Sequence, residues 1–219
     1  IIMNTDSIKK NASIISYYGL ALAGNKQYNE AIAQYQKALE MKSDDPKPLL
    51  YISEAYKGLG DEDKALEYNQ QYMDKNPNAA PTDFMKLAEI YVNKAKKDPK
   101  TKTENIEKAI AVYAKLAEKY PTLKPFAKLQ EGNTAFQNEL DDKAIPAYTE
   151  VINELEAKQC DADEISYLKQ AYQYMGFIYT YDKQDFDTAK PYFDKLLKLD
   201  PNNKIAKDAF EKAGIQPGA

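Results

Sequence analysis

Three acidic clusters contain the side chains of this chain that could most readily do chemistry. They occupy residues 141–142, 161–164 and 182–187. Carboxylates can bind Ca²⁺ or act as an acid–base pair, but none of the clusters has the central glycine and distal glutamate of a calcium-binding loop. Each lies where a helix is expected to begin, and a carboxylate there accepts hydrogen bonds from free backbone N–H groups. We therefore interpret the clusters as helix caps; an acid–base pair stays open, although no feature selects one.

The residue types that are missing narrow the chemistry further. The 219 residues include no His, so the usual proton shuttle and the commonest metal ligand are lacking. They also include no Arg, which supplies the planar fork for phosphate and carboxylate. Cys160 is the only cysteine, so an internal disulfide is impossible, and its polar surroundings indicate a passive thiol. We predict that the chain is not an enzyme and has no catalytic, cofactor-binding or metal-binding residues.

The charge of the chain limits its partners. Its net charge is −4 and its isoelectric point about 5.2, so we expect no binding to nucleic acid. No apolar run is long enough to span a bilayer, so we expect no membrane insertion. One basic cluster stands out: Lys94, Lys96, Lys97, Lys100 and Lys102. We interpret it as a solvated segment with Asp98 and Glu104 as partial counterions; the alternative is a docking patch for an acidic partner.

The elements that must position these groups follow a repeated pattern. Five alanines are 34, 44, 35 and 45 residues apart: Ala31, Ala65, Ala109, Ala144 and Ala189. An aromatic ring follows the alanine by four residues in all but the second repeat, and a proline follows by twelve in three of them. A unit of about 34 residues cannot bury its apolar face alone, so it must stack on copies of itself.

Each period reads as two amphipathic helices joined by a short turn. Ile14, Ile15, Tyr18 and Leu22 recur at helical spacing, and no alternating run indicates a strand, which predicts an all-α fold. Small residues would allow the paired helices to approach closely, with Gly19 facing Ala31 and the next aromatic wedged between hairpins. The small residues expected to pack the repeats are Gly19, Ala31, Ala65, Ala88, Ala109, Gly132, Ala144, Gly176 and Ala189.

This pattern resembles the tetratricopeptide repeat (TPR) family of bacterial type. The match covers nearly the whole chain, although the tryptophan common in the family is replaced by Ile15, Leu49 and Phe84. The resemblance implies an αα-hairpin solenoid, a right-handed TPR superhelix. The expected hairpins span residues 12–45, 46–80, 81–124, 125–163 and 164–202, and together form a repeat region at 12–202. We expect a capping helix at 203–214 and a tail or remnant of upstream sequence at 1–11, since the chain opens on Ile1.

The resemblance also implies a concave face, formed by the first helix of each hairpin, that binds peptides or protein segments. The candidates on this face are Met85, Phe126, Leu129, Asn133, Phe136, Phe177, Thr180 and Tyr181. They form an aromatic, weakly charged strip in which rings could anchor apolar side chains while Asn133 or Thr180 meets the backbone. The alternative is that several of them only pack between repeats.

We therefore predict a non-catalytic scaffold that binds a peptide or protein partner in its groove, as a monomer or weak homo-oligomer. One alternative is a structural subunit of a bacterial assembly that docks through its convex face or solenoid ends. Another is a regulatory module of a larger enzyme. We expect a soluble protein, cytoplasmic or, after removal of a leader, periplasmic or secreted.

Overall fold

The computed structural model describes residues 11–214, and every regular element in that range is a helix. The all-α prediction is therefore confirmed. The chain divides into two compact units, Ile1–Lys108 and Ala109–Ala219, each described by itself below. The predicted N-terminal tail lies outside the described residues except for Asn11, which caps the first helix.

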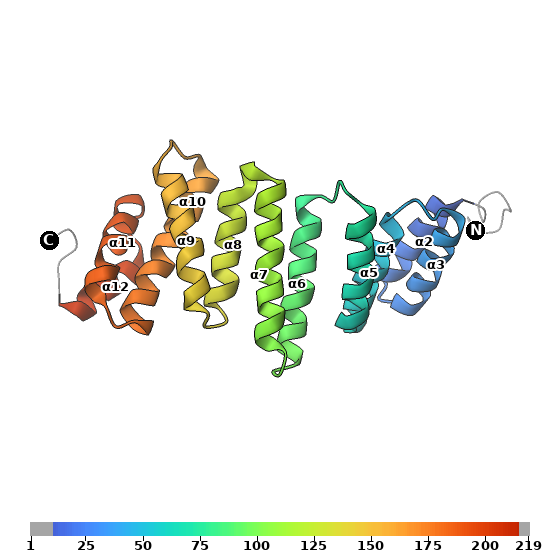
Figure 1. Cartoon of the computed structure of the whole chain (residues 1–219), viewed down its shortest axis with the longest axis horizontal. Helices are drawn as coiled ribbons and strands as arrows, with labels where there is room; N and C mark the ends of the chain where they lie inside the picture. The colour runs from blue at the N-terminus through green and yellow to red at the C-terminus, as the bar shows by residue number, and fades with distance from the viewer. Residues whose placement is uncertain (1–10, 215–219) are drawn as a thin grey trace. The chain divides into compact units, whose positions relative to one another are not determined.

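The helices follow one another in pairs along the chain (Figure 1). The first unit contains α2 (Ala12–Gly24), α3 (Tyr28–Met41), α4 (Lys47–Leu59), α5 (Glu62–Lys75) and α6 (Pro81–Lys97). The boundary between the units lies within α7 (Lys102–Lys119). The second unit continues with η2 (Pro121–Leu123), α8 (Lys124–Phe136), α9 (Asp141–Glu156), α10 (Ala162–Phe177), the π-helix η3 (Ile178–Asp182), α11 (Phe186–Leu199) and α12 (Lys204–Ala213).

Asx side chains fix where several helices begin. Asn11 accepts hydrogen bonds from the backbone of α2, and Asp61 accepts one at the start of α5. Asp161 forms a capping box with Glu164, and Asp185 accepts the backbone N–H of Thr188. Such caps satisfy N–H groups that have no partner within the helix. Two of the three acidic clusters thus contain helix caps.

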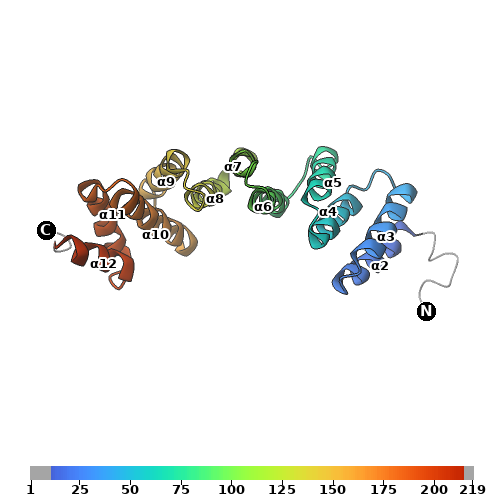
Figure 2. The same ribbon diagram turned by 90° about the horizontal axis from the view of Figure 1, so that it is seen from below.

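In the first unit, small residues allow the two helices of a hairpin to pack closely. Helix α2 packs on α3, and α4 packs on both α3 and α5 (Figure 2). A Cβ atom at Gly19 would lie 2.5 Å from the ring of Tyr35, so the glycine makes room for that ring. In the next hairpin Ser53 takes the place of the glycine, and its hydroxyl donates to the carbonyl of Ala65 at 2.7 Å.

The second unit repeats this arrangement. A Cβ atom at Gly132 would lie 2.6 Å from Tyr148, and one at Gly176 would lie 2.5 Å from Phe193. The atoms nearest to each glycine therefore belong to the aromatic residue one turn after the expected alanine. The same rings also contact the next hairpin, as expected: the centroid of Tyr35 lies 5.3 Å from that of Tyr51, and the centroid of Tyr148 lies 5.5 Å from that of Tyr174.

The predicted packing residues are all buried. The alanines have no exposed surface at all: Ala31, Ala65, Ala88, Ala109, Ala144 and Ala189. The three glycines are buried as well. The rings opposite them, Tyr35, Tyr148 and Phe193, are at most 1% exposed, so these contacts form the centre of each hairpin.

The extra residues at the two long steps of the repeat mostly lengthen helices. Helices α6 and α7 contain 17 and 18 residues, whereas α2 and α4 contain 13 each. Helices α9 and α10 contain 16 residues each. The added residues thus lengthen helices rather than adding a long unstructured loop.

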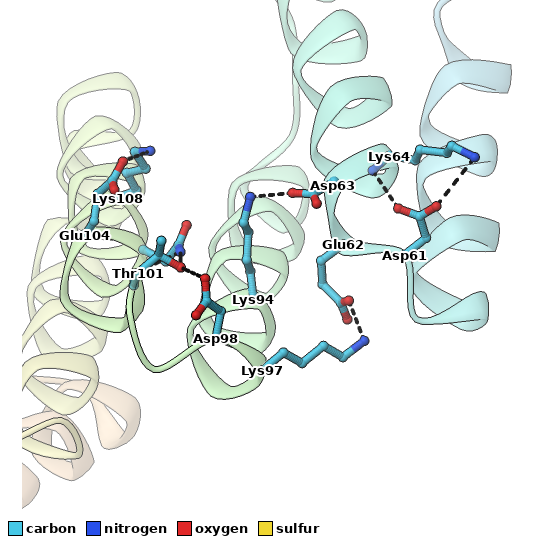
Figure 3. A network of polar contacts seen from close by, with 11 residues as sticks. Asp61, Glu62, Asp63, Lys64, Lys94, Lys97, Asp98, Thr101, Glu104 and Lys108 are labelled. Carbon is cyan, nitrogen blue, oxygen red and sulfur yellow. Dashed lines mark hydrogen bonds and ion pairs between the residues drawn. The ribbon is translucent and has the colours of Figure 1, made fainter.

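Two of the five lysines of the basic cluster pair with acidic residues of the preceding hairpin (Figure 3). Lys94 pairs with Asp63, and the ammonium of Lys97 lies 2.5 Å from Glu62 and 2.6 Å from the carbonyl oxygen of Gly60. The counterions expected from sequence, Asp98 and Glu104, bind other groups: Asp98 accepts from Thr101 and Glu104 pairs with Lys108. Acidic residues at the start of α5 therefore supply the neutralising charge.

Candidate protein-binding site

Four aromatic residues form a continuous cluster on α8, α10 and η3, which we call the aromatic strip: Phe136, Tyr174, Phe177 and Tyr181. The ring centroid of Phe136 lies 4.9 Å from that of Tyr174 and 5.6 Å from that of Phe177. The centroids of Phe177 and Tyr181 are 4.6 Å apart. Offset and edge-on contacts at these distances stabilise the rings in fixed positions.

The aromatic strip rests on a buried ring beneath it. Tyr148 is fully buried and stacks on Tyr174 at 5.5 Å, and its hydroxyl donates to Asn133 at 2.9 Å. Burial and the neighbouring Tyr174 raise the pKa of Tyr148 above its usual value of 10, so it stays a neutral donor at physiological pH. This anchoring reduces the entropy that a ligand would have to remove on binding.

A surface hollow of about 380 Å³ lies beside the aromatic strip. We call it the acidic hollow; it is lined by Phe136, Glu139, Asp141, Phe177 and Asp182. The two rings come from the ends of α8 and α10, while the carboxylates come from the α8–α9 turn, α9 and η3. The hollow therefore combines aromatic walls with negative charge.

The electrostatic field of the acidic hollow is only partly neutralised. Asp141 pairs with Lys183 at 2.8 Å, whereas Glu139 and Asp182 form no ion pair with any residue between 11 and 214. Partial burial, Asp141 and Glu139 raise the pKa of Asp182 above its usual value of 3.8, with Lys183 opposing them. Negative charge thus accumulates where the two Phe rings meet the carboxylates.

The residues predicted for the groove lie in several different parts of the structure. Phe136, Phe177 and Tyr181 lie together in the aromatic strip, and Thr180 lies beside them on η3 with its hydroxyl buried and unpartnered. Leu129 is 1% exposed and belongs to the core of the second unit, so its prediction as a ligand contact is wrong.

The other predicted groove residues lie outside the strip. Phe126 contacts Tyr167 at 6.0 Å instead, and Asn133 is engaged by Tyr148. Met85 is 39% exposed on α6, in the first unit.

Sequence reasoning missed Tyr174 and Glu139, and it placed Asp141 and Asp182 in two acidic clusters that it interpreted as helix caps. Tyr174 could have been found from its spacing of three residues before Phe177, which places both on one face of a helix. No such signal showed that the three carboxylates share one hollow, because Glu139, Asp141 and Asp182 come from separate elements.

The first unit contains a second hollow, of about 480 Å³, between α2, α3, α4 and α6. Its wall includes Tyr35 and Tyr51, whose rings are 5.3 Å apart. Glu54 here is held between Lys57 at 3.1 Å and Lys86 at 3.3 Å. Because these charges neutralise one another, this hollow lacks the unpaired carboxylates found in the second unit.

The other features considered from the sequence are metal ligands, the single thiol and membrane-spanning helices. No group of acidic residues or Cys there could hold a metal ion. The thiol of Cys160 lies 3.1 Å from the carbonyl of Leu155, and burial together with Glu164 raises its pKa above 9.0. No helix between residues 11 and 214 has both the length and the apolar character to cross a bilayer.

Comparison with protein families identifies the repeat. Three models described as tetratricopeptide repeat match residues 22–83, 84–122 and 167–203. Together the matched segments reach into both units and include the helices α10 and α11 that flank η3.

Two curated relatives carry the same printed name, Photosystem I assembly protein Ycf3. The one from Rippkaea orientalis is 34% identical over 112 residues, which are 50% of this chain and 63% of that protein. The one from Prochlorococcus marinus is 29% identical over 121 residues, which are 52% of this chain and 69% of that protein. The chain thus spans less than two thirds of the first of these relatives.

Solved structures share the fold at low identity. The C-terminal part of a TPR repeat-containing protein from Cytophaga hutchinsonii has a TM-score of 0.71 and 23% identity, covering 94% of this chain and 75% of that one. YrrB, described as a TPR protein with an unusual peptide-binding site, has a TM-score of 0.57 and 19% identity, covering 93% of each chain. Identities this low support the helical repeat fold alone.

Proposed function

Because this chain belongs to the tetratricopeptide repeat family, we propose that it is a protein-interaction scaffold that holds a segment of a partner against the aromatic strip. The observation that carries the proposal is the strip itself, with Phe136, Phe177 and Tyr181 from different elements in mutual contact. Tyr181 is 39% exposed and Phe136 and Phe177 are half-buried, so the rings are fixed yet accessible. Rigid aromatic side chains of this kind dominate the binding energy of protein interfaces.

Membership of the tetratricopeptide repeat family supports binding rather than catalysis. We further propose that the chain acts as a monomer or weak homo-oligomer, which light scattering over a range of concentrations tests directly.

Selection of peptides tests the proposal. A random dodecapeptide library is panned against the whole chain, and the affinity of each recovered peptide is compared between wild type and Phe177→Ala. We expect a loss of about tenfold or more, since truncating an aromatic anchor typically costs more than 1 kcal/mol. Tyr17→Ala, which removes a ring that is 69% exposed in the first unit, serves as the matched control and should bind normally.

A second measurement guards against misfolding of the variant. A photoreactive benzoylphenylalanine at position 181 should crosslink the same peptides, whereas one at position 17 should not. Recovered peptides that bind Phe177→Ala normally and crosslink at position 17 would refute a site at the aromatic strip.

The curated relatives favour a second candidate function, a role in assembling a multisubunit complex. Both relatives are named assembly proteins, and the better match is 34% identical over 112 residues. Such a role would involve transient binding to subunits of the complex but absence from the finished assembly. Sedimentation of a tagged chain from native cells tests this: stable comigration with a mature complex would instead favour a structural subunit that docks through the convex face or the ends of the repeat array.

A regulatory role within a larger enzyme is the third possibility carried by the sequence. It requires the chain to be covalently joined to a catalytic domain, so the size of the native polypeptide on an immunoblot decides it. A native polypeptide close to the 24.8 kDa of this chain would refute it.

A further inference from the structure

The acidic hollow has the walls and charge of a receptor for one particular side chain. Resting on the proposed function, we propose that it accepts a lysine or arginine side chain of the bound protein segment, while the rest of the aromatic strip contacts neighbouring apolar residues. This assigns the partner a chemistry: a segment with a basic residue next to an apolar stretch.

The aromatic walls suit a cation. An ammonium or guanidinium within about 6 Å of a ring centroid is attracted by the negative face of the ring. The chain already makes this contact once at the strip, because the ammonium of Lys212 lies 5.6 Å from the centroid of Tyr181. Phe136 and Phe177 line the hollow and have no lysine of the described chain over them.

The carboxylates suit a cation as well. Asp141 already binds the ammonium of Lys183 at 2.8 Å, which demonstrates that this position accepts a lysine. Glu139 and Asp182 have no ion pair within the described residues, so three carboxylates face one cation. A basic side chain from a partner would bring the local charge close to balance.

Other occupants fit less well. An acidic side chain would be repelled, and an apolar one would take water from the carboxylates without replacing their hydrogen bonds. The carboxylates do not form a group that could hold a metal ion. A volume of about 380 Å³ lies at the lower end of the range for ligand pockets, roughly 300–1,000 Å³, and fits a side chain better than a large cofactor.

Capped amino acids provide a direct probe. N-acetyl-lysine methylamide and N-acetyl-arginine methylamide are titrated into the whole chain, and the aromatic NMR signals of Phe136, Phe177 and Tyr181 are followed. N-acetyl-norleucine methylamide has the same aliphatic stem without the charge and is the matched ligand control. We expect saturable shifts with the two cations and at least tenfold weaker binding of norleucine.

Two double variants test whether the carboxylates of the acidic hollow supply the charge that binds the lysine probe. Glu139→Gln with Asp182→Asn should weaken binding of the lysine probe about tenfold. Glu118→Gln with Asp142→Asn changes the net charge of the same unit equally, at two exposed positions outside the hollow, and should have little effect. Equal effects of the two double variants would show that only the overall field matters and would overturn the pocket.

The experiments can distinguish a failure of the acidic-hollow proposal from a failure of the proposed scaffold function. Peptides that depend on Phe177 but are not enriched in lysine or arginine, and that bind the Glu139→Gln/Asp182→Asn variant normally, would overturn this inference and leave the scaffold intact. Enrichment of basic residues with loss of binding in that variant supports it. Tighter binding of free spermidine than of any lysine-containing peptide would overturn it too, because the hollow would then be a polyamine site.

Discussion

Replacing Asn69 by leucine should stabilise the first unit, although this residue lies at the centre of a hairpin. Asn69 follows Ser53 by sixteen residues, the same interval that separates Gly19 from Tyr35 and Gly132 from Tyr148. It therefore occupies the place of a ring. Its side chain is fully buried, and neither its nitrogen nor its oxygen has a hydrogen-bond partner among residues 11–214.

The magnitude follows from the two unpartnered atoms. Leaving a buried polar group unsatisfied costs about 1–3 kcal/mol, and because both atoms belong to one amide we take about 1–2 kcal/mol for each, so that relieving both gives roughly 2–4 kcal/mol. Leucine branches at the same carbon as asparagine, and imperfect packing of its methyl groups subtracts about 1 kcal/mol. We expect Asn69→Leu to raise the free energy of unfolding of this hairpin by about 2 kcal/mol.

Hydrogen exchange of backbone amides in α4 and α5 is the suitable assay, because it reports local opening even where the two units unfold separately. Asn105→Leu is the matched control. Asn105 is also buried, at 3% exposure, but its side-chain nitrogen donates to the carbonyl and hydroxyl of Thr101 at 2.9 and 3.0 Å. Its replacement should bring no gain. An unchanged or lower stability of Asn69→Leu would refute the reasoning, as would an equal gain in both variants.

Three further outcomes are expected. Gly132→Ala should lower stability by about 1–3 kcal/mol in urea denaturation, because its Cβ would lie 2.6 Å from Tyr148, whereas Gly24→Ala, with open space around it, should gain up to about 1 kcal/mol; similar effects of both would contradict the close packing. Burial, opposed by Lys128, raises the pKa of Glu131 above 4.5, so the native state holds this proton more tightly and loses stability as the pH rises through that pKa. Glu131→Gln should therefore raise the urea midpoint at pH 7 but not below pH 4.5, and a gain confined to acidic pH would reverse the sign of the argument. Cys160, whose pKa is raised, should react with iodoacetamide at neutral pH more slowly than glutathione, and faster alkylation would show an activated thiol.

The spacing of small residues predicted much of the fold. The five alanines of the repeat are all fully buried, and the prolines Pro77, Pro121 and Pro201 each follow the end of a second helix. These features are local or recur at a fixed interval, so they can be read along the chain. The spacing did not predict that the ring four residues after the alanine supplies the atoms nearest to each glycine.

The candidate site was predicted only in part. Phe136, Phe177 and Tyr181 could be predicted because the family resemblance implies that they lie on the concave face, but Leu129, on the same helix as Phe136, lies in the core. Residues seven apart lie on one face of a helix, and the neighbouring helices decide which part of that face is covered. The counterions of Lys94 and Lys97 were missed for the same reason, since Glu62 and Asp63 are more than thirty residues away.

The sequence alone determined that this protein is a row of helical hairpins, because periodicity, caps and glycine–ring intervals act over at most one repeat. Only the tertiary structure decided that Glu139, Asp141 and Asp182 surround two phenylalanine rings. Whether they meet depends on how α8, α9 and η3 pack. Apolar residues recur at a regular spacing along a helix, whereas acidic residues that come together from different elements have no regular spacing in the sequence.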